Sequence, residues 1–242
     1  MNDRRFGWLA ALLAAGAVHA EPTLYVGNVP PYAFPEGAPQ RGLVYDLVRE
    51  TALRAGHSGK VSVVPLRRQT ALLLRQPDAM GSVTRLPERE ALYSWNVRLL
   101  QEKIVLVTRA DRSGEIAHLD AARRLRVGVV LGGPAESVAR RLGFEHIETT
   151  TNTQSNVNKL AVGRVDAIIT LGGLFTAGAA TQCAACPPLR EGLLLEKVDV
   201  YLAGASGMEP VLARQWRDAF DALRRDGGYA RIMQRYGRAA EP

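Results

Sequence analysis

Short apolar runs alternate with amphipathic stretches along the whole chain, and this alternation limits the possible folds more than any other feature. Strand-like runs rich in branched aliphatic residues occupy positions 24–27, 61–64, 79–83, 104–108, 126–130, 146–149 and 167–170. Helical periodicity marks positions 44–55, 67–74, 134–142, 155–162, 210–225 and 232–236. A helix between two strands brings the chain back to the side where the first strand began, so the next strand runs in the same direction. This order therefore predicts an α/β protein with mostly parallel sheets flanked by helices.

Two segments interrupt the alternation. The first is a charged link at Arg109, and the second is an extended stretch, residues 193–202, that crosses near Asp199. We therefore expect two lobes that are joined by two hinge crossings, with residues 21–109 and 199–242 in lobe 1 and residues 110–198 in lobe 2. A cleft between two such lobes is a common place for a small ligand.

Residues 1–20 have the layout of a secretory signal peptide. Arg4 and Arg5 precede an apolar stretch, residues 6–18, and Val18 and Ala20 place small residues before a cut after Ala20. The alternative is an uncleaved membrane anchor. Thirteen helical residues span about 20 Å, whereas a hydrocarbon core measures about 30 Å. We therefore expect cleavage and a periplasmic location.

Composition and motifs exclude several functional classes. Aromatic residues make up 6% of the 242-residue chain, and no run of five basic residues occurs, so we expect no nucleic-acid partner. The sequence contains no His-Glu-x-x-His, no Gly-x-Ser-x-Gly and no phosphate-binding loop. We therefore expect neither an enzyme nor a protein with a metal or another cofactor.

Several segments in one order resemble family 3 extracellular solute-binding proteins. They are Val26-Gly27 with Pro31-Tyr32, residues 42–46, residues 84–90 followed by Tyr93-Ser94-Trp95, residues 127–129 with Gly132-Gly133, residues 160–167, and residues 223–236. The resemblance implies a two-lobed periplasmic binding protein, type II-like and monomeric. Such a protein serves an ABC importer, whose membrane permease receives a small polar ligand, often an amino acid.

Arg89 is the first candidate for ligand binding, because the resemblance implies that an arginine at this position clamps a ligand carboxylate. A guanidinium offers two parallel N–H donors that match a carboxylate. Ser82 and Thr84 are two residues apart, so on an extended segment both side chains face the same way and can assist. The alternative is a surface arginine that is paired with Glu88 or Glu90.

Further candidates lie in both predicted lobes. The resemblance implies an aromatic cover over the ligand, which is Tyr32 or its neighbour Phe34. Gly132 and Gly133 precede a proline at a helix start, where free backbone N–H groups suit an anion, and Ser137 is the nearest hydroxyl. Core packing of the aromatics and a plain helix cap are the alternatives.

One departure from the family concerns the ligand ammonium. The resemblance implies an aspartate a few residues after Asp166, but this chain has Thr170, Leu171 and then two glycines. Because a buried cation without an anionic partner is costly, an ordinary α-amino acid is doubtful as a ligand unless Glu136 supplies the charge.

Cys183 and Cys186 form a Cys-x-x-Cys motif with two prolines directly after it. The prolines obstruct the helix that a redox-active pair needs at its first thiol. We therefore expect a structural disulfide in a tight loop rather than a catalytic pair.

Two other functions stay open at this point. A ligand-sensing or adaptor protein of the same fold would dock to a membrane sensor instead of a permease. A cyclohexadienyl-dehydratase-like enzyme would need an acid in the cleft, and Glu136 is the one candidate that the sequence offers.

The signal peptide generates a direct prediction. Protein expressed with its own leader in a bacterial host should be recovered from the periplasmic fraction and should begin at Glu21, because the cut falls after Ala20. Intact-mass measurement checks this expectation. A mass that still includes residues 1–20, or recovery with the membranes, would contradict it.

Overall fold

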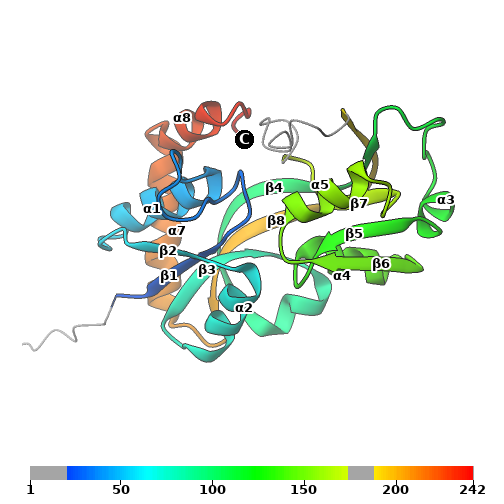
Figure 1. Cartoon of the computed structure of the whole chain (residues 1–242). Coiled ribbons are helices and arrows are strands. Elements are labelled where there is room, and N and C mark those ends of the chain that lie inside the picture. Colours follow the sequence, from blue (N-terminus) through cyan, green and yellow to red (C-terminus); the bar gives the residue numbers. More distant parts are fainter. Residues whose placement is uncertain (1–20, 174–187, 242) are drawn as a thin grey trace, which may run out of the picture.

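The computed structural model describes residues 21–173 and 188–241, and these residues form one mixed sheet with helices on its faces (Figure 1). The strand order is β2-β1-β3-β8-β4-β7-β5-β6. The α/β architecture expected from the alternation is thereby confirmed. Cys183, Cys186 and residues 1–20, where a signal peptide is expected, lie outside the described residues. Across the described ranges, no helix combines the length and the apolar character that a membrane span needs.

Each end of the sheet contains three parallel strands. At one end these are β1 (Thr23–Gly27), β2 (Val61–Val64) and β3 (Ala79–Thr84). At the other end they are β5 (Arg126–Val130), β6 (His146–Thr150) and β7 (Ala167–Leu171). Two sets of parallel strands therefore face each other across the middle of the sheet, as the two-lobed fold requires.

Helices cover each set of parallel strands. The first set is accompanied by α1 (Leu43–Arg54) and α2 (Leu66–Arg75), and the second by α3 (Leu119–Arg123), α4 (Pro134–Arg141) and α5 (Thr153–Ala161). The chain closes with α7 (Pro210–Arg225) and α8 (Gly228–Arg235) against the first set. Helix α8 starts four residues before its expected start, because Gly227 adopts φ 74° and Asp226 accepts a hydrogen bond from the Gly228 N–H at 2.7 Å.

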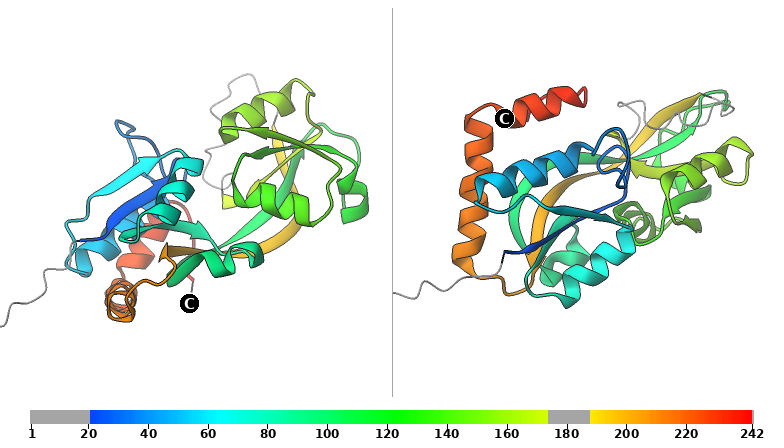
Figure 2. Two further views of the ribbon diagram at one scale, coloured as in Figure 1. Left: turned by 90° about the horizontal axis from the view of Figure 1, so that it is seen from below. Right: turned by 60° about the vertical axis from the view of Figure 1, so that its left-hand side comes forward.

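The two halves are joined by one long antiparallel ribbon. Strands β4 (Tyr93–Arg109) and β8 (Leu189–Ala205) pair from Tyr93↔Ala205 to Arg109↔Leu189. In the left view of Figure 2 this ribbon runs from the blue and cyan elements to the green ones. The sequence predicted only residues 104–108 and 193–202 as extended, because charged side chains at 98–103 hide the remainder of β4 from a search for apolar runs.

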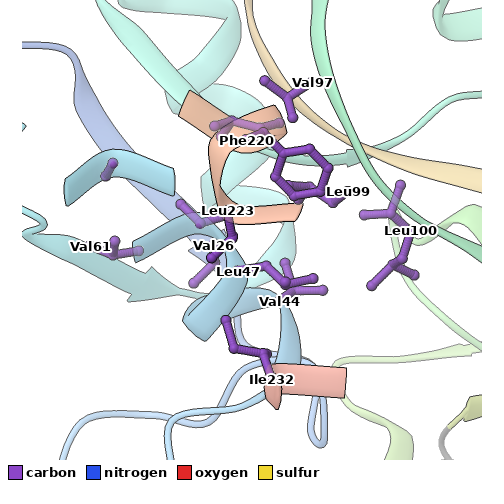
Figure 3. Close-up of a cluster of buried hydrophobic side chains, with 14 of the residues drawn as sticks. Val26, Val44, Leu47, Val61, Val97, Leu99, Leu100, Phe220, Leu223 and Ile232 are labelled. Atoms are coloured by element: carbon purple, nitrogen blue, oxygen red, sulfur yellow. The ribbon is translucent and has the colours of Figure 1, made fainter. Parts of the chain in front are cut away.

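Four hydrophobic clusters of the described residues include side chains of this ribbon, and the two largest lie toward its opposite ends. The first contains Leu99 and Leu100 of β4 with α1, α7 and α8, and Figure 3 shows part of it. The second contains Ile104 and Leu106 of β4 with the strands and helices of the other half. Strand β8 changes core between Val198 and Val200. Since the cores change at these points, the ribbon links two separately packed bodies.

The C-terminal tail holds the ribbon near the place where the cores change. Arg238 forms an ion pair with Glu102, whose side chain is 3% exposed. The Glu241 carboxylate accepts a hydrogen bond from the Gln101 N–H at 2.6 Å and lies 3.2 Å from Arg98. These contacts connect the last residues of the described chain to the middle of β4.

The Arg238–Glu102 pair predicts a large stability effect. Arg238→Met should lower the free energy of unfolding by about 3 kcal/mol, because it leaves the buried Glu102 carboxylate without a cation. Arg231→Met is the control, since Arg231 is 66% exposed and its loss should cost less than about 0.5 kcal/mol. Urea unfolding followed by circular dichroism measures both. Equal effects of the two substitutions would contradict the role of the pair.

Candidate functional site

A cavity lies between the two halves, at the carboxyl ends of parallel strands from both. Its volume is about 720 Å³, part of which is open to solvent. Residues from both halves line it, including Tyr32, Ser82, Thr84, Gly133, Thr153 and Thr170. The carboxyl ends of parallel strands are the usual place for a ligand in α/β folds. We call this cavity the inner chamber.

A second space continues outward from the inner chamber and shares Val29, Val130 and Thr153 with it. Its volume is about 1890 Å³ with its opening to solvent. Phe34 and several prolines form one wall, and the start of α5 forms the other. We call this space the outer chamber. Neither lining includes a charged side chain of the described residues.

Arg89 lines neither chamber; it lies in a short 3-10 helix (Pro87–Leu92), next to Thr84, which lines the inner chamber. Its guanidinium donates to the carbonyl of Thr84 at 3.5 Å and, across the cleft, to the carbonyl of Gly132 at 3.4 Å. Burial lowers the pKa of Arg89 from its ordinary value, while Tyr93 and Glu88 oppose that shift. The half-buried cation therefore spans both sides of the cleft at a place that water reaches poorly.

The carboxylates nearest to Arg89 in the sequence, those of Glu88 and Glu90, lie close to other arginines. Glu90 forms a two-pronged ion pair with Arg85, and Glu88 lies 4.0 Å from Arg141. None of the described carboxylates forms an ion pair with Arg89. The structure therefore leaves the Arg89 guanidinium with two long hydrogen bonds to carbonyls and no described counter-ion.

Four of the predicted ligand contacts line the inner chamber, namely Tyr32, Ser82, Thr84 and Gly133. Ser82 and Thr84 share one face of β3, as their spacing predicted. Tyr32 faces them from the loop after β1 and is 5% exposed. Burial raises the pKa of the Tyr32 hydroxyl, although the charge of Arg238 acts in the opposite direction, so the phenol stays protonated. Phe34 instead lines the outer chamber.

The turn before α4 differs from the expectation of free backbone donors. The Gly132 N–H donates to the Glu136 carboxylate at 2.7 Å, and the Gly133 N–H donates to the Val130 carbonyl at 3.0 Å. Arg140 holds the other oxygen of Glu136 at 2.7 Å. Gly133 lines the inner chamber, whereas Glu136 and Ser137 line neither chamber. The Glu136 side chain of α4 therefore already accepts from the Gly132 N–H that a ligand anion would need.

Thr170 and Leu171 line the inner chamber at the position where the family resemblance implied an aspartate. Asp166 lies at the far end of β7, where it accepts hydrogen bonds from the Arg126 guanidinium at 2.9 and 3.1 Å. These bonds lower its pKa and make it a structural residue. No carboxylate of the described residues replaces the missing aspartate.

The sequence analysis missed Gln69, which lines the inner chamber and is 2% exposed. Its signal was present in the sequence. Gln69 occupies the stripe of α2 that also contains Leu66 and Leu73, so a polar residue replaces an apolar one on the buried face. Within the described ranges, no group of three or more histidine, cysteine or acidic side chains is arranged to hold a metal ion.

A comparison with family models matches residues 24–239 to bacterial extracellular solute-binding proteins, family 3. No curated protein matches the chain.

Solved structures share the fold at low sequence identity. The arginine-, lysine-, histidine-binding protein ArtJ from Geobacillus stearothermophilus has a TM-score of 0.77 and 18% identity, over 90% of this chain and 96% of that one. A histidine kinase sensor domain with similarity to periplasmic binding proteins has a TM-score of 0.76 and 18% identity, over 91% and 98%. The ancestral amino acid-binding protein AncCDT-1, a precursor of cyclohexadienyl dehydratase, has a TM-score of 0.72 and 20% identity, over 89% and 95%.

The environment of Arg89 predicts how its removal affects stability. In protein without ligand, Arg89→Met should leave the free energy of unfolding unchanged or raise it by up to about 1 kcal/mol, because a poorly solvated cation without an ion pair is removed. Arg126→Met is the control and should be destabilising, since it breaks the ion pair with Asp166. Chemical unfolding measures both. A loss of more than about 2 kcal/mol in Arg89→Met would identify Arg89 as a structural anchor instead.

Proposed function

Since the chain belongs to the family 3 bacterial extracellular solute-binding proteins, we propose that it closes on a small, carboxylate-bearing ligand and delivers it to an ABC importer. The protein acts in the periplasm as a monomer after removal of residues 1–20. It binds its ligand without chemical change. The membrane permease of the importer is its second partner.

The proposal that the ligand bears a carboxylate rests on the environment of Arg89. A half-buried guanidinium that has only long hydrogen bonds to two carbonyls gains most from a ligand anion, because a carboxylate accepts two parallel N–H bonds at close range. Ser82 and Thr84 line the adjacent wall and are suited to complete the carboxylate site with their hydroxyls. Tyr32 covers the ligand from the opposite side.

Closure is proposed as a rotation of two lobes about the β4–β8 ribbon. Lobe 1 consists of residues 21–109 and 199–242, and lobe 2 of residues 110–198. The change of core in β8, between Val198 and Val200, agrees with this division, whereas in β4 the core changes between Leu100 and Ile104, ahead of residue 109. Arg89 already contacts Gly132 across the cleft, so a ligand anion between them would link the two lobes in the closed state.

A ligand-sensing role is the second candidate, and the similarity to a histidine kinase sensor domain favours it. In that case the closed protein would dock to a membrane sensor. Chemical crosslinking in the periplasm, with ligand present, separates the two roles. Capture of a permease supports delivery, and capture of a sensor kinase supports signalling.

The dehydratase alternative is weakened by the position of Glu136. Both of its carboxylate oxygens are occupied, one by the Gly132 N–H and the other by Arg140. An acid that is held in this way is poorly placed to protonate a ligand. Incubation with prephenate or arogenate should therefore give no product.

The carboxylate proposal predicts a specific loss of binding. A thermal-shift screen of mature protein against amino acids, dicarboxylates, polyamines and sulfonates first selects the best ligand. Arg89→Ala should then weaken its binding by about 2–5 kcal/mol, the range for breaking a buried charge pair. Arg89→Lys should restore only part, since an ammonium lacks the planar fork.

Isothermal titration calorimetry of the three proteins tests this prediction. Unchanged affinity in Arg89→Ala would remove the clamp from the proposal. A best ligand that is a polyamine without any acidic group would contradict the carboxylate itself.

A further inference from the structure

Gln69 is a buried amide in the wall of the inner chamber. It lies on the inward face of α2 and is 2% exposed. The residues around it in the wall are mainly aliphatic, among them Leu66 and Val44. A polar side chain in such surroundings needs a hydrogen bond for each of its polar atoms.

A hydrogen bond fixes the orientation of the amide. Nε2 donates to the carbonyl oxygen of Ser82 at 2.5 Å. Rotating the amide by half a turn would place Oε1 against that carbonyl, and two acceptors would then face each other. The donor side of Gln69 therefore points at β3, and its acceptor is held in the opposite direction.

The acceptor side has no partner. Oε1 is buried and forms no hydrogen bond. It lies over Gly27, another residue of the chamber wall, and a Cβ at position 27 would come within 2.7 Å of it. Because an unsatisfied buried carbonyl is unfavourable, a hydrogen-bond donor that reaches Oε1 would be stabilising.

We propose that Gln69 Oε1 accepts a hydrogen bond from a neutral hydroxyl group on the ligand, and that the ligands are hydroxy-carboxylates. The inference rests on the proposed function, in which Arg89 takes the carboxylate. A hydroxyl needs one acceptor, which Gln69 supplies. An ammonium would also need a counter-charge, and no described residue of either chamber lining offers one. Gln69 is thus the residue that selects the second functional group of the ligand.

Matched small acids test the inference. The probes are propionate and butyrate, their hydroxylated counterparts (lactate, 3-hydroxybutyrate and 4-hydroxybutyrate), and the corresponding amino acids. Calorimetry with mature wild-type protein should show at least one hydroxy acid that binds about tenfold more tightly than its unsubstituted and amino counterparts, the difference expected for satisfying one buried acceptor.

Two substitutions assign that preference to Gln69. Gln69→Met removes the acceptor at similar volume, so the hydroxy acid should fall to the affinity of its unsubstituted counterpart. Gly27→Ala places a Cβ 2.7 Å from both Oε1 and a Leu66 methyl group, so it displaces the acceptor, and it should have the same effect. Gln76→Met is the matched control, because Gln76 follows the same helix and its amide oxygen binds Tyr25 outside both chambers.

The outcomes separate this inference from the proposed function. Equal binding of hydroxylated and unsubstituted acids by the wild type would overturn the role of Gln69 and leave the carboxylate site intact. Tighter binding of an amino acid, or an equal loss for both acids in Gln69→Met, would also overturn it. If the wild type binds none of these acids, and no other carboxylate in the screen, the proposed function itself fails. Arg89→Ala should weaken both members of a pair, unlike Gln69→Met.

Discussion

The antiparallel pairing of β4 with β8 is the constraint on which the rest of this structure depends. Each set of three parallel strands needs a covering helix layer and a core of its own, and neither set pairs with the other. The two 17-residue strands run through both sets and hydrogen-bond along almost their whole length. Irregular pairing between Arg98 and Leu100 and between Ile104 and Val105 lies on either side of the charged middle of β4. One continuous ribbon thus joins two bodies and places their strand ends face to face.

The chemical character of the cleft follows from that placement. Strand ends from both halves supply mainly aliphatic side chains and hydroxyls, and the described residues of the lining carry no charge. Two polar groups here lack a strong partner. Beside the lining, Arg89 offers a cation without a described carboxylate, and within the lining Gln69 offers an acceptor without a donor. Under the proposed function, a ligand that carries a carboxylate and a hydroxyl group would supply both missing partners.

Other charged groups have partners within the protein, and these pairs stabilise the fold. Glu102 is buried but paired with Arg238, Asp166 is paired with Arg126, and Glu136 is held by Gly132 and Arg140. These groups have their hydrogen bonds within the protein, so they hold the ribbon, the start of β5 and the turn before α4. The contrast between satisfied and unsatisfied polar groups therefore separates these structural residues from Arg89 and Gln69, the residues proposed to bind the ligand.

The sequence by itself determined what depends on neighbouring residues. Apolar runs and helical periodicity predicted most strands and helices, and a spacing of two predicted that Ser82 and Thr84 share a face, because strand geometry is local. Only the tertiary structure decided which polar groups find partners. Arg238 and Glu102 are 136 residues apart, and no local sequence pattern predicts that they pair. The charged middle of β4 becomes a strand because distant residues pair with its charges. The N–H groups of Gly132 and Gly133 donate within their own turn. The Gln69 amide donates to the Ser82 carbonyl, and this orientation leaves its oxygen without a donor. Long-range packing sets these outcomes, since a hydrogen bond depends on where both partners lie in space and not on the sequence around either one.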